Sequence, residues 1–155
     1  MAIHFEIAKH AVCNPANVLA QNYGEHMFSI QLNGDTDNGS LVAVGDYLSL
    51  DLFKEAAVTS FEGKIVQQMT NGNYLVMVTD PGDAVLVYEK PLIAEEYSNN
   101  FKKISNFYNK AGEVVRCYGL HKYDRFEVSK EAFSGTPAVG ATISSVSNKK
   151  MVIGA

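Results

Sequence analysis

The fold class of this chain is decided by residues 63–88, GKIVQQMTNGNYLVMVTDPGDAVLVY. Asn71-Gly72 lies between two apolar runs, and this dipeptide is the strongest short-range signal for a β-hairpin, here joining residues 63–69 to 74–79. Asp80-Pro81-Gly82-Asp83 has the composition of a second turn and precedes a third apolar run at 84–88. The stretch predicts a β-meander of three strands.

Further short strands are predicted on both sides of this run, because alternating apolar, β-branched and aromatic residues recur there. They cover residues 26–32, 41–50, 55–58, 112–120, 124–129, 142–146 and 150–153. Ser129 to Gly135 combines a cap-type serine with a terminating glycine and predicts a single helical turn. Residues 94–110 carry apolar side chains at helical spacing but are rich in Asn, so a helix and an ordered aromatic loop both stay open.

This series of short strands with so little helix predicts a mainly β fold, an antiparallel β-barrel or sandwich with at most one short helix. The chain has 155 residues, 46% of them hydrophobic and 19% charged, which suits one domain with a sizeable core. We expect a single β-rich domain over residues 26–155. Residues 1–25 show scattered apolar positions and a turn signal at Asn14-Pro15, and we expect them to form an extended N-terminal arm.

One short phrase occurs twice, as Ala43-Val44-Gly45-Asp46-Tyr47-Leu48-Ser49 and as Ala138-Val139-Gly140-Ala141-Thr142-Ile143-Ser144. Each copy has a glycine between an apolar pair and an aliphatic residue followed by serine, which suits a glycine corner that leads into a strand. We interpret the two as equivalent corners of the β-framework, each opening a hairpin, at 43–58 and 138–153. The alternative is that the two corners are unrelated, because one repeated phrase is weaker evidence for a structural repeat than an array of three or more copies.

Charge is distributed unevenly along the chain, whose formal net charge is −4. Residues 1–96 carry a net charge of −9 and residues 97–155 a net charge of +5. Two arrangements would bring these halves together: strands of both halves interleave in one molecule, which we favour, or the basic end of one molecule meets the acidic end of another. The acidic total argues against a nucleic-acid partner, and no apolar run approaches the ~20 residues that span a bilayer.

Few residues have the spacing of a catalytic or metal-binding site, and we expect no catalytic residue, cofactor or metal. Cys13 and Cys117 are far apart and predict buried free thiols. The four histidines lack partners at metal-ligand spacing, so we interpret them as surface or capping residues. They are His4, His10, His26 and His121.

Two loops have the composition of a local binding site. Residues 33–39, NGDTDNG, resemble a calcium loop only in composition: the sixth position lacks glycine and the twelfth is Val44, so we predict a solvated hairpin loop. Residues 121–124 gather His121, Lys122 and Asp124 between two strands and form the most plausible polar site. A solvated connecting loop has the same composition, and no nucleophile pairs with this group.

Two parts of the sequence carry a family resemblance. Residues 37–51 (DNGSLVAVGDYLSLD) precede a strand region that ends in Tyr88-Glu89-Lys90, and residues 107–129 (FYNKAGEVVRCYGLHKYDRFEVS) follow it. Together they resemble the small β-rich head auxiliary or capsid decoration proteins of tailed bacteriophages that infect Gram-positive bacteria. The likeness covers about residues 37–143 and leaves out the first 36.

The resemblance implies a structural virion protein, not an enzyme, that binds the outside of a phage capsid and stabilises it. Its partner would be the major capsid protein, and it would act as a homo-oligomer, with a trimer as one arrangement. It would be made in the host cytoplasm and reside on the capsid exterior, with the N-terminal arm reaching the capsid or a neighbouring subunit. The alternative from a different class is a non-enzymatic β-barrel module that binds a carbohydrate or small ligand.

Overall fold

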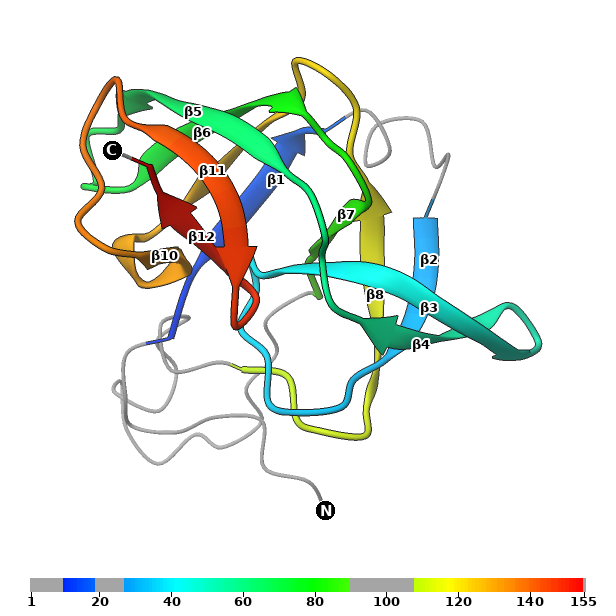
Figure 1. The fold of residues 1–155 in the computed structure, drawn as a ribbon. Helices are drawn as coiled ribbons and strands as arrows, with labels where there is room; N and C mark the ends of the chain where they lie inside the picture. The colour runs from blue at the N-terminus through cyan, green and yellow to red at the C-terminus, as the bar shows by residue number, and fades with distance from the viewer. Residues whose placement is uncertain (1–9, 19–26, 90–107, 155) are drawn as a thin grey trace, which may run out of the picture.

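The computed structural model describes residues 10–18, 27–89 and 108–154 (Figure 1). Twelve strands and one 3-10 turn account for the regular structure of these residues. The strands are β1 (Cys13–Asn17), β2 (Met27–Gln31), β3 (Leu41–Ser49), β4 (Leu52–Ala56), β5 (Glu62–Gln68), β6 (Tyr74–Asp80), β7 (Ala84–Val87), β8 (Val114–Gly119), β9 (Arg125–Val128), β10 (Phe133–Ser134), β11 (Thr142–Ser147) and β12 (Lys150–Ile153), and the turn is η2 (Lys130–Ala132).

Two sheets make up the fold. One is open and has seven strands in the order β1-β9-β6-β5-β11-β12-β10. The other is a closed ring of five strands, in which β2 pairs with β4, β4 with β3, β3 with β7, β7 with β8, and β8 again with β2. The prediction of a mainly β fold is therefore confirmed. Strand pairs are antiparallel except β2 with β4 and β10 with β12, which are parallel.

Alternating side chains on the ring strands serve two separate cores. Ile30, Val42, Val85, Val87 and Cys117 belong to a cluster contributed by all the ring strands. Their neighbours on the opposite face pack with the open sheet in a second, larger cluster that includes Leu41, Leu86, Tyr118, Ile65 and Phe126. Because both faces of β7 meet apolar partners, all four of its residues are buried.

The predicted hairpin of β5 and β6 is confirmed, but the three-stranded meander is wrong. β6 pairs with β5 and β9 in the open sheet, whereas β7 pairs with β3 and β8 in the ring. The turn at residues 80–83 thus carries the chain from one sheet to the other. A strand that is buried on both faces reads as a continuous apolar run, and such a run does not indicate which sheet it joins.

The N-terminal arm predicted over residues 1–25 needs correction where the structure describes it. Residues 13–17, including the supposed turn at Asn14-Pro15, form strand β1, which pairs with β9 at the edge of the open sheet. An edge strand tolerates proline because one side of its backbone is left unpaired. The predicted segment at 94–110 lies outside the described residues except for its last three positions.

The two glycine corners are not equivalent, although both predicted hairpins, β3 with β4 and β11 with β12, are present. Gly45 lies inside β3 beside a register shift, and a Cβ there would stand 2.5 Å from the carbonyl oxygen of Lys54 across the hairpin. Gly140 lies in the turn before β11 with a φ of +90° and open space around it. One glycine allows a close approach and the other a left-handed backbone.

The two oppositely charged halves interleave within one molecule, as favoured from the sequence. β9 lies between β1 and β6, and β8 lies between β2 and β7. The predicted helical turn is present as η2, yet Ser129 does not cap it with its side chain. The Ser129 hydroxyl instead accepts a hydrogen bond from the backbone N–H of Val12, 3.0 Å away. No helix in the described residues has the length and apolar content to cross a bilayer.

Candidate functional site

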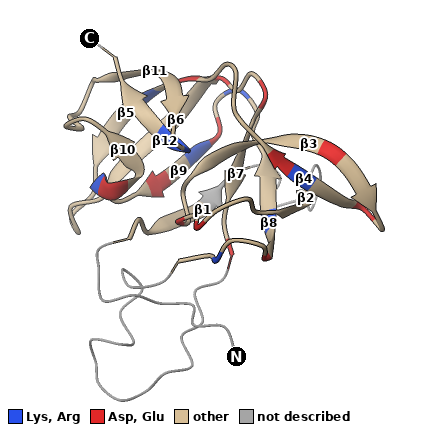
Figure 2. Ribbon diagram, turned by 60° about the horizontal axis from the view of Figure 1, so that its bottom comes forward, with Lys and Arg blue, Asp and Glu red and all other residues tan. Residues whose placement is uncertain are grey.

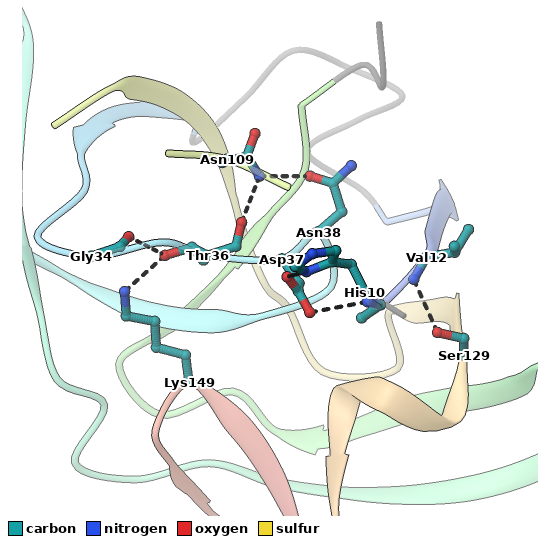
Figure 3. A network of polar contacts seen from close by, with 10 residues as sticks. His10, Val12, Gly34, Thr36, Asp37, Asn38, Asn109, Ser129 and Lys149 are labelled. Carbon is teal, nitrogen blue, oxygen red and sulfur yellow. Dashed lines mark hydrogen bonds and ion pairs between the residues drawn. The ribbon is translucent and has the colours of Figure 1, made fainter. Parts of the chain in front are cut away.

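The loop of residues 33–39, between β2 and β3, is the centre of a polar network (Figure 3). Its backbone pairs with residue 109, since Thr36 and Asn109 exchange N–H to carbonyl hydrogen bonds of 2.8 Å in each direction. Thr36 and Asn38 are buried. The prediction of a solvated hairpin loop is therefore wrong, because β2 and β3 do not pair with each other and later segments cover the loop.

Two buried asparagines hold this loop to the end of β7. Asn38 donates to the carbonyl of Glu89 at 2.8 Å and accepts from the N–H of Glu89 at 3.0 Å. Asn109 donates to the side-chain oxygen of Asn38 and to the carbonyl of Thr36, both at 3.1 Å. Buried amides need such partners, so these side chains are committed to the fold and not to a bound ion.

His10 and Asp37 form the most compact charged contact in this region. The His10 Nδ1 lies 2.6 Å from one carboxylate oxygen of Asp37, whose other oxygen accepts from the N–H of Ala11 at 3.0 Å. The imidazole is stacked on the ring of Tyr108 with 4.9 Å between centroids. His10 thus has a structural role, joining the start of β1 to the loop, and short-range sequence patterns carry no sign of this pairing.

Lys149 connects the same loop to a second feature, an open cavity of about 370 Å³. Its Nζ donates to the hydroxyl of Thr36 at 2.7 Å and lies 2.8 Å from Oε1 of Glu55, an ion pair without well-aligned hydrogen-bond geometry. The Glu55 side chain is only 8% exposed. Because the pair joins β4 to the turn between β11 and β12, its two members are far apart in the sequence and no local motif indicates them.

The cavity lies at the base of the β3–β4 hairpin, and we call it the base cavity. Residues 55–58, Asn33 and the turn residues Asn148 and Lys149 surround it, and the side chains of Leu41 and Val146 add apolar lining. The cavity thus combines an apolar surface with one neutralised charge pair and two amides. Its volume of about 370 Å³ lies in the lower part of the range of small-molecule sites.

The opposite end of this hairpin, residues 46–51, projects from the body, and we call it the hairpin tip (Figure 1). Exposed apolar side chains gather here: Leu50 is 96% exposed, Tyr47 57% and Leu48 45%. Acidic positions accompany them along the outer part of the hairpin (Figure 2). Leu50 and Asp51 make the turn with φ angles of 51° and 60°.

The loop 121–124, the most plausible polar site in the sequence, is a tightly bonded turn. The carboxylate of Asp124 accepts from the N–H of His121 at 2.8 Å, and its Oδ2 lies 3.6 Å from the His121 ring nitrogen. Backbone bonds of 2.8 Å tie Tyr123 and Asp124 to Val78. Lys122 is directed elsewhere, with its Nζ 5.2 Å from the centre of the Tyr123 ring. The structure therefore brings His121 and Asp124 together but not Lys122.

Both cysteines are buried and free, as predicted. Cys13 belongs to the core between the sheets and Cys117 to the core of the ring. Burial raises the pKa of each thiol far above its ordinary value, which keeps both in the unreactive protonated form. Within the described parts of the chain, no group of three or more His, Cys, Asp or Glu side chains is placed to hold a metal ion.

Comparison with known proteins identifies no relative: no family model matches the sequence, and the searches of curated proteins and of solved structures found no significant match.

Proposed function

We propose that this chain is a structural protein of a phage virion, which binds the outer surface of the capsid and stabilises the shell. The proposal rests on the resemblance over residues 37–51 and 107–129. Its support from the structure is that these separate segments belong to one unit: β3 and β8 both pair with β7, and Asn38 joins Asn109 and Glu89. The residues that carry the resemblance thus shape a shared framework.

The proposed mechanism is thermodynamic linkage and involves no chemical step. A protein that binds the mature shell more tightly than its precursor stabilises the mature form by the difference in binding free energy. A broad surface contact with the major capsid protein would supply this energy. Self-association would add avidity, because an assembly of several copies leaves the capsid only when all of its contacts with the capsid are broken.

The test uses virions of the phage whose genome encodes the chain. Quantitative mass spectrometry of purified virions should find the protein in a fixed ratio to the major capsid protein. The isolated protein should cosediment with expanded capsids and much less with unexpanded precursors, which serve as the matched control. Its absence from virions, or equal sedimentation with and without capsids, contradicts the proposal.

The base cavity favours a second candidate, a module that binds a carbohydrate or small ligand. Its volume of about 370 Å³ falls in the range of small-molecule pockets. A panel of monosaccharides and small polar metabolites, screened by thermal shift and ligand-observed NMR, tests this candidate. Binding should disappear when Ala57→Trp fills the cavity. A panel that produces no saturable shift rejects it.

A further inference from the structure

The hairpin tip carries a leucine, Leu50, at a position that is exposed to water and has a left-handed backbone conformation. Leu50 is the most exposed large apolar side chain in the described residues, at 96%. Its φ of 51° lies in the left-handed region, which bulky residues adopt at a cost and which Asn, Asp or Gly accept more readily. A turn selected for stability alone would carry one of those residues, so Leu50 points to a contact outside the molecule.

The base cavity, whose lining is partly apolar and partly polar, is a hollow that could receive such a side chain. Its lining includes Leu41, Val58 and Val146, and its volume of about 370 Å³ exceeds the need of one leucine. Its only described ion pair is internal, between Glu55 and Lys149. A leucine that entered the cavity would contact the apolar part of the lining, and the charges of that pair would already neutralise each other.

The tip and the cavity lie at opposite ends of the same hairpin and do not fill each other. Leu41 lines the cavity and Leu50 follows β3, a separation of about 30 Å for an extended strand. The cavity of one molecule is thus open to the tip of another. Such a contact joins two different surfaces, so it is head-to-tail and closes into a ring or continues as a filament.

Charge complementarity supports a second copy as the occupant. The tip carries Asp46 and Asp51 beside its apolar residues, and residues 46–51 include no basic side chain. Lys149 in the turn lines the cavity, and the exposed Lys150, the first residue of β12, follows it; Glu55 neutralises only Lys149. The Lys150 ammonium would attract the carboxylates of an approaching tip.

We propose that this chain self-associates head-to-tail, with the hairpin tip of one copy placing Leu50 in the base cavity of the next. The proposed contact does not depend on the capsid role, and it defines a binding surface made from two copies. A monomeric variant can still be tested for cosedimentation with capsids, so failure of one proposal is distinguishable from failure of the other.

The experiment measures the mass of the full-length protein by sedimentation velocity over a wide concentration range. The wild type should form species larger than a monomer. Leu50→Asp should weaken association by about 10- to 100-fold, because burial of a leucine is lost and a charge replaces it. This change suits the left-handed turn, so the fold should persist. Ala57→Trp, at an exposed position lining the cavity, should weaken association similarly.

Val139→Asp is the matched control, because Val139 is 58% exposed and lies in the turn before β11, outside both surfaces. It should associate like the wild type. The decisive measurement mixes the two monomeric variants: Leu50→Asp keeps its cavity and Ala57→Trp keeps its tip, so together they should form a 1:1 complex.

Four results overturn the proposal: a wild type that stays monomeric at the highest concentration reached, an unchanged Leu50→Asp or Ala57→Trp variant, an equal effect of Val139→Asp, or no complex in the mixture.

Discussion

Gly45 and Gly140 occupy similar local sequences but meet different physical constraints. At Gly45 the obstacle is the backbone of a paired strand, because an added Cβ would lie 2.5 Å from the Lys54 carbonyl oxygen. Backbone in the middle of a hairpin cannot move aside cheaply. At Gly140 the surroundings are open, and only the φ of +90° disfavours a side chain.

We expect Gly45→Ala to destabilise the fold by about 1–3 kcal/mol through overpacking, and Gly140→Ala by about 1–2 kcal/mol through its left-handed backbone. Melting temperatures should fall by several degrees in both. Gly34→Ala is the control, since its φ is not left-handed and its nearest neighbour is the Lys149 Nζ at 3.9 Å. A Gly45→Ala variant as stable as Gly34→Ala would show that the β3–β4 hairpin relaxes.

Asp83 is the residue at which pH should act on stability. Partial burial opposes ionisation, but hydrogen bonds from Thr59 and Ser60 outweigh it and lower the pKa of the carboxyl below its ordinary value of 3.8. A carboxyl whose pKa is lowered by folding stabilises the protein above its unfolded pKa. That contribution is lost as the pH falls through the folded pKa.

Asp83→Asn should therefore reduce the free energy of unfolding at neutral pH, by at most about 1 kcal/mol because the site is exposed. At a pH well below the folded pKa the difference from the wild type should vanish, since the carboxyl is then protonated in both states. Urea unfolding at the two pH values measures this. Asp46→Asn provides an exposed acidic control, and a difference for Asp83→Asn that is the same at both pH values rejects the explanation.

Among the elements, the two hairpins β3–β4 and β11–β12 depend on each other. The N–H of Leu41 donates to the carbonyl of Lys149 at 3.0 Å, and the Lys149 side chain pairs with Glu55. These contacts also shape the base cavity. The two hairpins therefore stabilise each other through these contacts. The sequence predicted each hairpin but not the contacts between them.

Breaking this pair should cost more than losing an exposed one. Glu55→Gln removes the carboxylate that faces the Lys149 ammonium, and because the Lys149 side chain is only 25% exposed we expect a loss of about 1–3 kcal/mol. The double variant Glu55→Gln/Lys149→Met should recover part of this loss, because no unpaired charge remains. Urea unfolding of both single variants and the double variant gives the coupling energy. Additive effects would indicate that the ion pair does not contribute.

At the scale of the whole molecule, interleaved strands should make unfolding cooperative. β8 and β9 come from the second half of the chain, yet each lies between strands of the first half. Neither half contains a complete sheet among its described strands. Both cores also share the ring strands, so loss of one exposes the other.

We expect a single unfolding transition, with coincident curves from far-UV circular dichroism and from the near-UV signal of the eight tyrosines. Separate fragments of residues 1–96 and 97–155 should be unfolded alone. Two resolved transitions, or a fragment with native-like amide dispersion in NMR spectra, would contradict this expectation. The Val139→Asp variant supplies a surface-substituted control with the same topology.

Local patterns in the sequence determined which segments are extended and which turns are tight: the alternation in β2 and β9, the Asn-Gly turn between β5 and β6, and the last hairpin were all predictable. Tertiary structure alone decided that β7 leaves the meander, that Asn38 and Asn109 become buried partners, that Glu55 meets Lys149, and that Gly45 and Gly140 differ. The physical reason is range: strand formation and short turns depend on neighbouring residues, whereas the choice of partner depends on how two sheets close around shared cores.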